Sequence, residues 1–213
     1  MAKIVGSKCK LCRRAGEKLF IKGDRCASPK CAMVRKAYGP GVHGPIGSGK
    51  HSISEFGRQL AQKQKIKRIY GISERQLRKH LDEAKIQKGV VGDNLIARLE
   101  MRFDNVVYRM GMALSRTAAR QLVSHSHFLV NGKILNIPSA WLKVGDIISV
   151  KPTKQQSSKF FKDLKIILKK GGKIPGWVSF DSEKLEGKIV AKPTRNEIGT
   201  VLDVQSVIEF YSR

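Results

Sequence analysis

The dominant feature of this sequence is its excess of positive charge. Its 213 residues contain 42 Lys and Arg but only 17 Asp and Glu, which gives a formal net charge of +25 at pH 7. Like charges at this density repel one another in a compact state unless counterions or a polyanion neutralise them. We therefore expect the partner to be a nucleic acid or an anionic membrane surface.

Apolar residues are frequent enough for this basic chain to fold, because they make up 41% of it and its length suits one or two domains. No run of about 18 apolar residues could span a membrane. The first twenty residues are rich in Lys and Arg, where a signal peptide would need an apolar block. We expect a cytoplasmic protein without a membrane partner.

All four cysteines lie in the first 31 residues, in the pattern C-x2-C-x13-C-x4-C formed by Cys9, Cys12, Cys26 and Cys31. Two short pairs separated by a loop are typical of a tetrahedral Cys₄ zinc site. Disulfides, or a redox pair at the first two cysteines, are the alternatives, but a reducing cytosol favours metal. We predict one structural Zn²⁺ ion held by all four thiolates, which leave no open position for catalysis.

Two basic helices are predicted after a Gly- and Pro-rich loop at residues 39–51. The first helix has Phe56 on its apolar stripe and ends at Gly71. Ser73 and Gln76 form a capping box that begins the second helix. We interpret Phe56 as a core residue.

A change of apolar period from 3.6 to 2 marks a second folding unit. One helix is predicted from Asn94 to Met110, and a shorter one begins after Ser115. Asn131-Gly132 between two apolar runs predicts a hairpin with a type I′ turn, and 147–150 reads as a third strand. Residues 94–151 therefore predict a compact helix-helix-strand module.

The C-terminal third is predicted to be less regular. A Lys-rich stretch over 152–175 reads as a basic helix or an extended arm, and a short strand follows near Trp177. Turn signals lie near Gly187, and an apolar stripe at the C-terminus is expected to pack back on the body.

The overall prediction is an α+β protein with three parts. Residues 1–51 form a zinc segment and linker, 52–93 a helical domain completed by about 190–213, and 94–189 an RNA-binding domain with its core module at 94–151.

Catalytic motifs are not convincing in this chain. Gly44 to Lys50 fits the first seven positions of a phosphate-binding loop, but His51 stands where Mg²⁺ needs Ser or Thr, and no buried strand precedes the loop. None of the five histidines lies beside a plausible nucleophile and orienting acid. We predict that the protein is not an enzyme and has no small-molecule substrate.

The basic helices carry more charge than they can pair internally. Seven cations between residues 63 and 79 meet only Glu74, so we expect phosphates to neutralise them. These cations are Lys63, Lys65, Lys67, Arg68, Arg75, Arg78 and Lys79.

Several motifs are similar to those of a known protein family. They are Arg102–Arg109 (RFDNVVYR), Ala119–Val123 (ARQLV), Val130–Lys133 (VNGK), Gln64–Gln76, and Lys22–Cys26 (KGDRC) in the cysteine segment. The chain resembles the family of bacterial-type ribosomal protein number four of the small subunit, in its cysteine-bearing form. The resemblance implies a mostly helical first domain and an RNA-binding module of two helices on a small antiparallel sheet. Pseudouridine synthases and tyrosyl-tRNA synthetases share that module.

The resemblance implies binding to the five-prime domain of small-subunit rRNA, a role in nucleating assembly, and contact with small-subunit protein number five. It also implies a place near mRNA at the entry channel, an influence on decoding accuracy, and location on a cytoplasmic or organellar ribosome. On the module it implies RNA contacts by Ser115, Arg116, Arg120, Gln121, Ser124, His125, His127, Asn131 and Lys133. The other predicted RNA contacts are the seven cations above with Arg13, Arg14, Lys22, Arg25, Tyr70 and Gln76.

Two departures from the family pattern concern Phe103, where Leu is usual, and Ser126, where Gly is usual. If the second position needs a positive φ, serine costs about 1 kcal/mol there. We also expect that replacing Arg116 and Arg120 with Glu abolishes RNA binding and leaves the fold intact. The rival functions are an RNA-modifying enzyme, for which residues 152–213 are too short, and a zinc-containing DNA-binding regulator.

Overall fold

The computed structural model describes residues 6–44, 53–158, 160, 161, 163, 164, 174–198 and 202–212. The predicted loop beyond residue 44, including the rejected phosphate-binding motif, and the Lys-rich arm over 165–173 lie outside these residues. Within them, no helix combines the length and the apolar character that crossing a bilayer requires.

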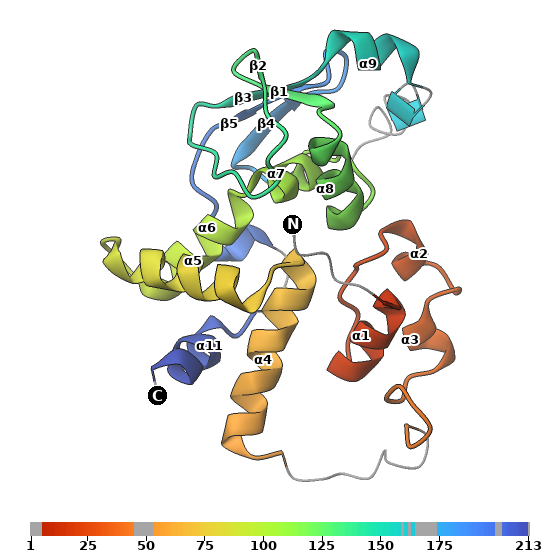
Figure 1. The fold of residues 1–213 in the computed structure, drawn as a ribbon, viewed down its shortest axis with the longest axis vertical. Helices are drawn as coiled ribbons and strands as arrows, with labels where there is room; N and C mark the ends of the chain where they lie inside the picture. The colour runs from red at the N-terminus through yellow and green to blue at the C-terminus, as the bar shows by residue number, and fades with distance from the viewer. Residues whose placement is uncertain are drawn as a thin grey trace. The chain divides into compact units, whose positions relative to one another are not determined.

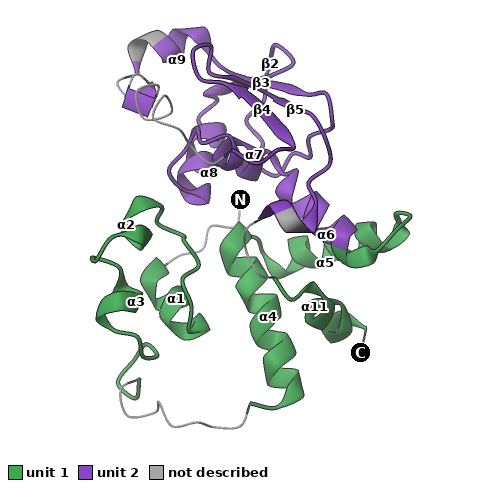
Figure 2. Cartoon of the chain, turned by 180° about the vertical axis from the view of Figure 1, so that it is seen from behind, with its two compact units in different colours: residues 1–92, 200–213 green, residues 93–199 purple. Residues whose placement is uncertain are grey.

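The chain forms two compact units (Figure 2). Unit 1 comprises residues 1–92 and 200–213, and unit 2 comprises residues 93–199. The chain therefore returns to unit 1 at residue 200, which is later than the boundary near residue 190 that we expected.

Unit 1 is helical (Figure 1). Its helices are α1 (Lys8–Ala15), α2 (Asp24–Ala27), α3 (Ala32–Arg35), α4 (Glu55–Tyr70), α5 (Glu74–Ile86) and α11 (Val204–Tyr211).

Local capping signals set the ends of α4 and α5 as the sequence predicts. Helix α4 ends at Gly71, whose φ of 62° is the left-handed conformation that glycine adopts at low cost. The Ser73 hydroxyl accepts a hydrogen bond from the Gln76 N–H, and the Gln76 side chain accepts one from the Ser73 N–H. The predicted capping box is confirmed.

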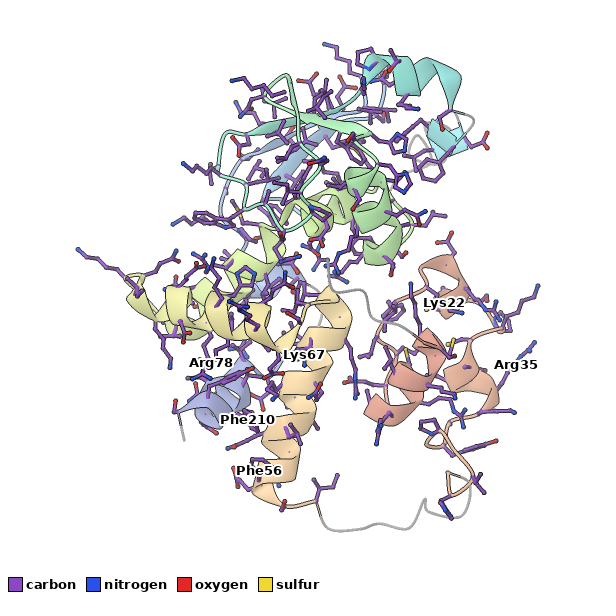
Figure 3. The ribbon with its side chains drawn as sticks, in the orientation of Figure 1. Lys22, Arg35, Phe56, Lys67, Arg78 and Phe210 are labelled. Carbon is purple, nitrogen blue, oxygen red and sulfur yellow. The ribbon has the colours of Figure 1, made fainter. Side chains whose placement is uncertain are left out.

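Helix α11 packs against α4, as the C-terminal apolar stripe predicts. Val204 and Val207 are buried on it, together with Ile66 and Ile69 of α4. The interpretation of Phe56 as a core residue is wrong, because its side chain is 49% exposed. It lies in the first turn of α4, with its ring 5.4 Å from that of Phe210 (Figure 3).

Glu74 joins three helices of unit 1. It accepts hydrogen bonds from Lys63 Nζ at 2.9 Å and Lys67 Nζ at 2.7 Å on α4, and from the Tyr211 hydroxyl on α11. Burial alone would raise the pKa of Glu74, but hydrogen bonds from Lys67, Tyr211 and Lys63 outweigh it and lower the pKa to about 2.

Unit 2 places helices beside a five-stranded antiparallel sheet of order β2-β1-β3-β5-β4 (Figure 1). Its elements are α6 (Val91–Glu100, whose first two residues belong to unit 1), α7 (Phe103–Arg109), α8 (Arg116–Ser124), β1 (Phe128–Val130), β2 (Lys133–Ile134), β3 (Ile147–Val150), α9 (Pro152–Ser157), β4 (Val178–Asp181), β5 (Glu186–Ile189) and a 3₁₀ turn at Arg195–Ile198.

The core of unit 2 lies between the α7–α8 pair and the sheet. Val106 of α7, Ala119 of α8, Phe128 of β1 and Ile148 of β3 are fully buried in one cluster. The hairpin is confirmed, because Asn131 and Gly132 both have positive φ, at 49° and 80°. Ser115 also caps α8 as predicted, accepting a hydrogen bond from the Ala118 N–H.

The predicted continuous helix from Asn94 to Met110 is wrong. Helix α6 ends at Glu100, and Arg102 is extended, with φ −68° and ψ 139°. Arg102 forms a bridge with Trp141, and the Phe103 N–H donates to the Ala140 carbonyl at 2.9 Å. The apolar period continues through the break because both helices face buried clusters, so the sequence pattern hides it.

The turn expected near Gly187 is present at residues 182–185, whereas Gly187 itself belongs to a strand. It lies within β5, which pairs with β3 and β4. A Cβ at this position would come within 2.8 Å of the Met110 sulfur, so glycine permits a close approach of strand and helix. The chain turns just before β5, where Leu185 has φ 51°.

Ser126 lies between α8 and β1 with φ 58°, a conformation that costs a serine about 1 kcal/mol relative to glycine. We expect Ser126→Gly to raise the free energy of unfolding by about 1 kcal/mol. Ser124→Gly, inside the last turn of α8, should lower it by about 0.5 to 1 kcal/mol. Urea unfolding tests both changes, and a Ser126→Gly protein no more stable than wild type would refute the strain.

The contribution of Glu74 to stability should depend on pH. Because its pKa falls from 4.5 when unfolded to about 2 when folded, the contribution is complete above about pH 4.5 and is lost as the pH falls toward 2. We expect Glu74→Gln to be destabilising near neutral pH, with a difference from wild type that shrinks below pH 4.5. Asp82→Asn, which neutralises an exposed carboxylate on α5, is the control and should change little. Urea unfolding across pH 2 to 7 measures this, and a constant difference would contradict it.

Candidate nucleic-acid interface

The module of unit 2 is organised around two buried carboxylates. Glu100, the last residue of α6, is 0% exposed, and Asp104, in the first turn of α7, is 3% exposed. Burying a carboxylate is costly unless it is paired and hydrogen-bonded. Four arginines provide that pairing, and positive charge is therefore in excess around the site. They are Arg102, Arg109, Arg116 and Arg120.

Asp104 accepts hydrogen bonds from two arginines, Arg102 just before it in the chain and Arg120 on the neighbouring helix. Arg102 donates from Nε and Nη2 at 3.2 and 3.1 Å, and its side chain is only 2% exposed. Arg120 of α8 donates from Nε and Nη2 to a single oxygen of Asp104 at 2.9 and 2.6 Å. Asp104 thus fixes the direction of the Arg120 side chain, which is 20% exposed.

Glu100 holds the other two arginines. Arg109 donates to both of its carboxylate oxygens, at 2.7 and 2.8 Å, and the Asn105 amide donates to it at 2.7 Å. Arg116 Nη2 lies 3.8 Å from Glu100, while its Nε donates to the Asn105 oxygen at 2.7 Å. The Arg116 guanidinium also lies 4.7 Å from the centre of the Tyr108 ring.

Helix α8 therefore presents oriented guanidinium groups on one stripe. Arg116, Arg120 and Ser124 follow one another at intervals of four residues. A guanidinium carries five N–H donors in a fixed fork, which matches phosphate oxygens as well as carboxylates. Since the carboxylates have already restricted the side-chain rotamers, binding a phosphate backbone costs less conformational entropy. This arrangement is suited to gripping a polyanion.

The remaining module residues divide into two groups. Gln121, His125 and Lys133 are exposed, as an RNA contact requires. Ser115 is buried as the cap of α8, and the Asn131 side chain bonds to the Asp146 carboxylate and the Ile147 N–H. Ser115 and Asn131 therefore stabilise the local structure of the predicted RNA face.

The predicted contacts of unit 1 divide in the same way. Lys63 and Tyr70 are buried, and Lys67 is committed to Glu74, so these side chains stabilise the helices. Lys65 pairs with Glu17 at 2.9 Å, a partner outside the span in which we counted acids. Gln76 completes the capping box.

Other cations of unit 1 do reach solvent. Arg13 donates to the Tyr38 and Gly39 carbonyls at 2.9 Å, whereas its neighbour Arg14 is exposed. Burial, and then the nearby Arg14, lower the pKa of Arg68. The exposed members of the predicted set are Arg14, Lys22, Arg25, Arg75, Arg78 and Lys79, of which Lys22 and Arg78 are labelled in Figure 3.

Sequence reasoning missed the carboxylate network itself. Glu100 and Asp104 are four residues apart, as are Arg116 and Arg120, and these two spacings are the only local sign of it. The pairing joins separate helices, so it depends on the break at Arg102 that the apolar period does not show.

The four cysteines line one pocket between α1, α2 and α3, and none of them forms a disulfide. The Lys22 N–H donates to the Cys26 sulfur at 3.4 Å. Among the described residues, however, no three His, Cys, Asp or Glu side chains lie close enough together to hold a metal ion. The thiols therefore share a pocket without forming a coordination sphere.

Comparison with known proteins gives consistent results over the whole chain. Residues 3–100 match the ribosomal protein S4/S9 N-terminal domain family, and residues 101–148 match the S4 domain family. The chain is 47% identical to the small ribosomal subunit protein uS4 of Acetivibrio thermocellus and 48% identical to that of Syntrophomonas wolfei. Both alignments cover all of this chain and all of the relative.

Neutralising Asp104 tests the network. Asp104→Asn leaves the buried Arg102 without a countercharge, and we expect a loss of about 3 to 5 kcal/mol in the free energy of unfolding. The exposed Asp82→Asn control should stay within about 0.5 kcal/mol of wild type. Urea unfolding measures both, and an Asp104→Asn change below about 1 kcal/mol would contradict the assignment. Because Arg116 and Arg120 pair with the same buried carboxylates, we now expect Glu at positions 116 and 120 to destabilise the fold as well.

Proposed function

The chain belongs to the ribosomal protein S4 family, and we propose that it is a structural component of the small ribosomal subunit that binds small-subunit rRNA directly. The family is one of structural ribosomal proteins, so the protein is not an enzyme. The rival readings, an RNA-modifying enzyme and a DNA-binding regulator, leave these full-length matches unexplained.

One observation carries the RNA-binding part of the proposal. Two buried carboxylates hold Arg116 and Arg120 on α8 with an excess of positive charge around them. Together with the net charge of +25, this favours a phosphate backbone over a neutral partner.

Finer parts of the proposal rest on family membership. We propose that the protein binds the five-prime domain of the rRNA, helps to nucleate assembly, and contacts small-subunit protein number five. Its place is near mRNA at the entry channel, where it contributes to decoding accuracy, on a ribosome in the cytoplasm or in an organelle.

We also propose that the cysteines bind one structural Zn²⁺ ion. The C-x2-C-x13-C-x4-C spacing and the common pocket support this. Cys9, Cys12, Cys26 and Cys31 would hold the ion, which would supply folding free energy to a polar segment and no chemistry.

A competition experiment tests the proposed function. We expect tight binding to five-prime-domain rRNA that survives bulk tRNA and duplex DNA, with log K falling by roughly 0.7 to 0.9 per contacted phosphate for each log unit of salt. Lys133→Ala should reduce that slope by roughly one contact, whereas Lys143→Ala, an exposed residue outside the predicted set, should not. Equal affinity for all three nucleic acids would mean that the charge binds polyanions without selection.

Metal analysis tests the zinc proposal. We expect one zinc per chain in the purified protein, loss of it in Cys9→Ser, and loosening confined to residues 1–38 in hydrogen exchange. Ser7→Ala, two residues away, is the control and should keep the ion. Stoichiometric zinc in Cys9→Ser would exclude a four-thiolate site.

A further inference from the structure

A pocket of about 170 Å³ opens beside α8. Three of its residues lie in α8 and a fourth caps that helix, at spacings of three and four, and the others come from the residue before β1 and from the segment after α9. The pocket, called the α8 pocket below, is lined by Ala118, Gln121, Leu122, His125, His127 and Phe160.

Aromatic rings give this pocket flat walls. The imidazole rings of His125 and His127 are nearly parallel, with an interplanar angle of 7° and centroids 6.2 Å apart. The His127 ring lies edge-on to Phe161, at 5.8 Å and 65°, and Phe161 packs in turn against Phe160. A planar ligand that stacks on one imidazole is therefore parallel to the other as well.

The pocket combines imidazole and amide groups with apolar walls. Burial, Lys154 and His125, in that order, lower the pKa of His127, which favours the neutral form of its ring. Its Nδ1 atom is buried and has no hydrogen-bond partner within the described residues. Gln121 supplies an exposed amide that can both donate and accept. These groups suit a planar, uncharged ligand with hydrogen-bonding edges, and they do not suit a phosphate.

Cations are also present around the pocket. Lys154 lies within electrostatic range of His127, while Arg116 and Arg120, held by Glu100 and Asp104, project from a different side of α8. A flat pocket with a cation close by has the arrangement expected for one nucleotide, with its base in the pocket and its phosphate on a nearby cation.

We propose that the α8 pocket receives one unpaired RNA base, which stacks on His125 and is hydrogen-bonded by Gln121. This inference rests on the proposed function, since it names the part of the RNA that the same module selects. RNA recognition commonly uses unstacked bases held against aromatic or histidine rings. An apolar protein side chain would fill the walls but would leave the Gln121 amide and the His127 Nδ1 atom without a polar partner.

The test compares His125→Ala, Gln121→Ala and His125→Phe. The probe is five-prime-domain rRNA treated with dimethyl sulfate, which methylates unpaired adenine and cytosine bases. We expect wild type to protect at least one unpaired base that both alanine variants leave reactive. Affinity should fall about 5- to 150-fold in His125→Ala, which is the range for losing one stacked base. His125→Phe keeps the stacking surface and should retain both affinity and protection.

His43→Ala, which removes an exposed histidine of unit 1, is the matched control and should behave as wild type. Thermal unfolding of each variant checks that the substitution leaves the fold intact. An unchanged rRNA affinity together with an unchanged protection pattern in His125→Ala would overturn the pocket assignment. This holds also if that variant loses binding to a ribosomal protein instead. Failure of the wild-type protein to prefer this rRNA over tRNA would refute the proposed function itself, so the two failures are distinguishable.

Discussion

The pairing of arginines with buried carboxylates is the interaction on which the rest of unit 2 depends. Asp104 and Glu100 can be buried only because guanidinium groups surround them. The same contacts fix the start of α7, join it to α8, and aim Arg116 and Arg120 along one stripe. Stability and the proposed recognition of RNA therefore rely on the same atoms.

In unit 1, some of the basic side chains bind a carboxylate that joins helices and are therefore not available to RNA. Lys63 and Lys67 are bound to Glu74, whereas Arg75 and Arg78 in the first turns of α5 remain exposed. A count of cations therefore overstates the surface available to phosphates. Which lysines are structural depends on the return of α11, whose Tyr211 hydroxyl shares the same carboxylate.

Features set by neighbouring residues were predictable from the sequence. The capping box at Ser73, the glycine that ends α4 and the hairpin at Asn131 each follow from two or three adjacent positions. The break at Arg102 was not predictable, because it depends on a bridge to Trp141, and neither was β5, where Gly187 makes room for a distant methionine. In the site, residue types pointed to RNA, but only the fold separates the exposed cations from those that serve packing.

The central claim is that the arginines of α8 are oriented before RNA arrives. The Nε–H groups of Arg102, Arg109, Arg116 and Arg120, observed by nitrogen-15 NMR in the free protein, test it most directly. We expect four resolved signals that exchange slowly with water, with those of Arg116 and Arg120 shifting when five-prime-domain rRNA is added. Signals from the two α8 arginines that coincide with those of mobile surface arginines in the free protein would contradict the account.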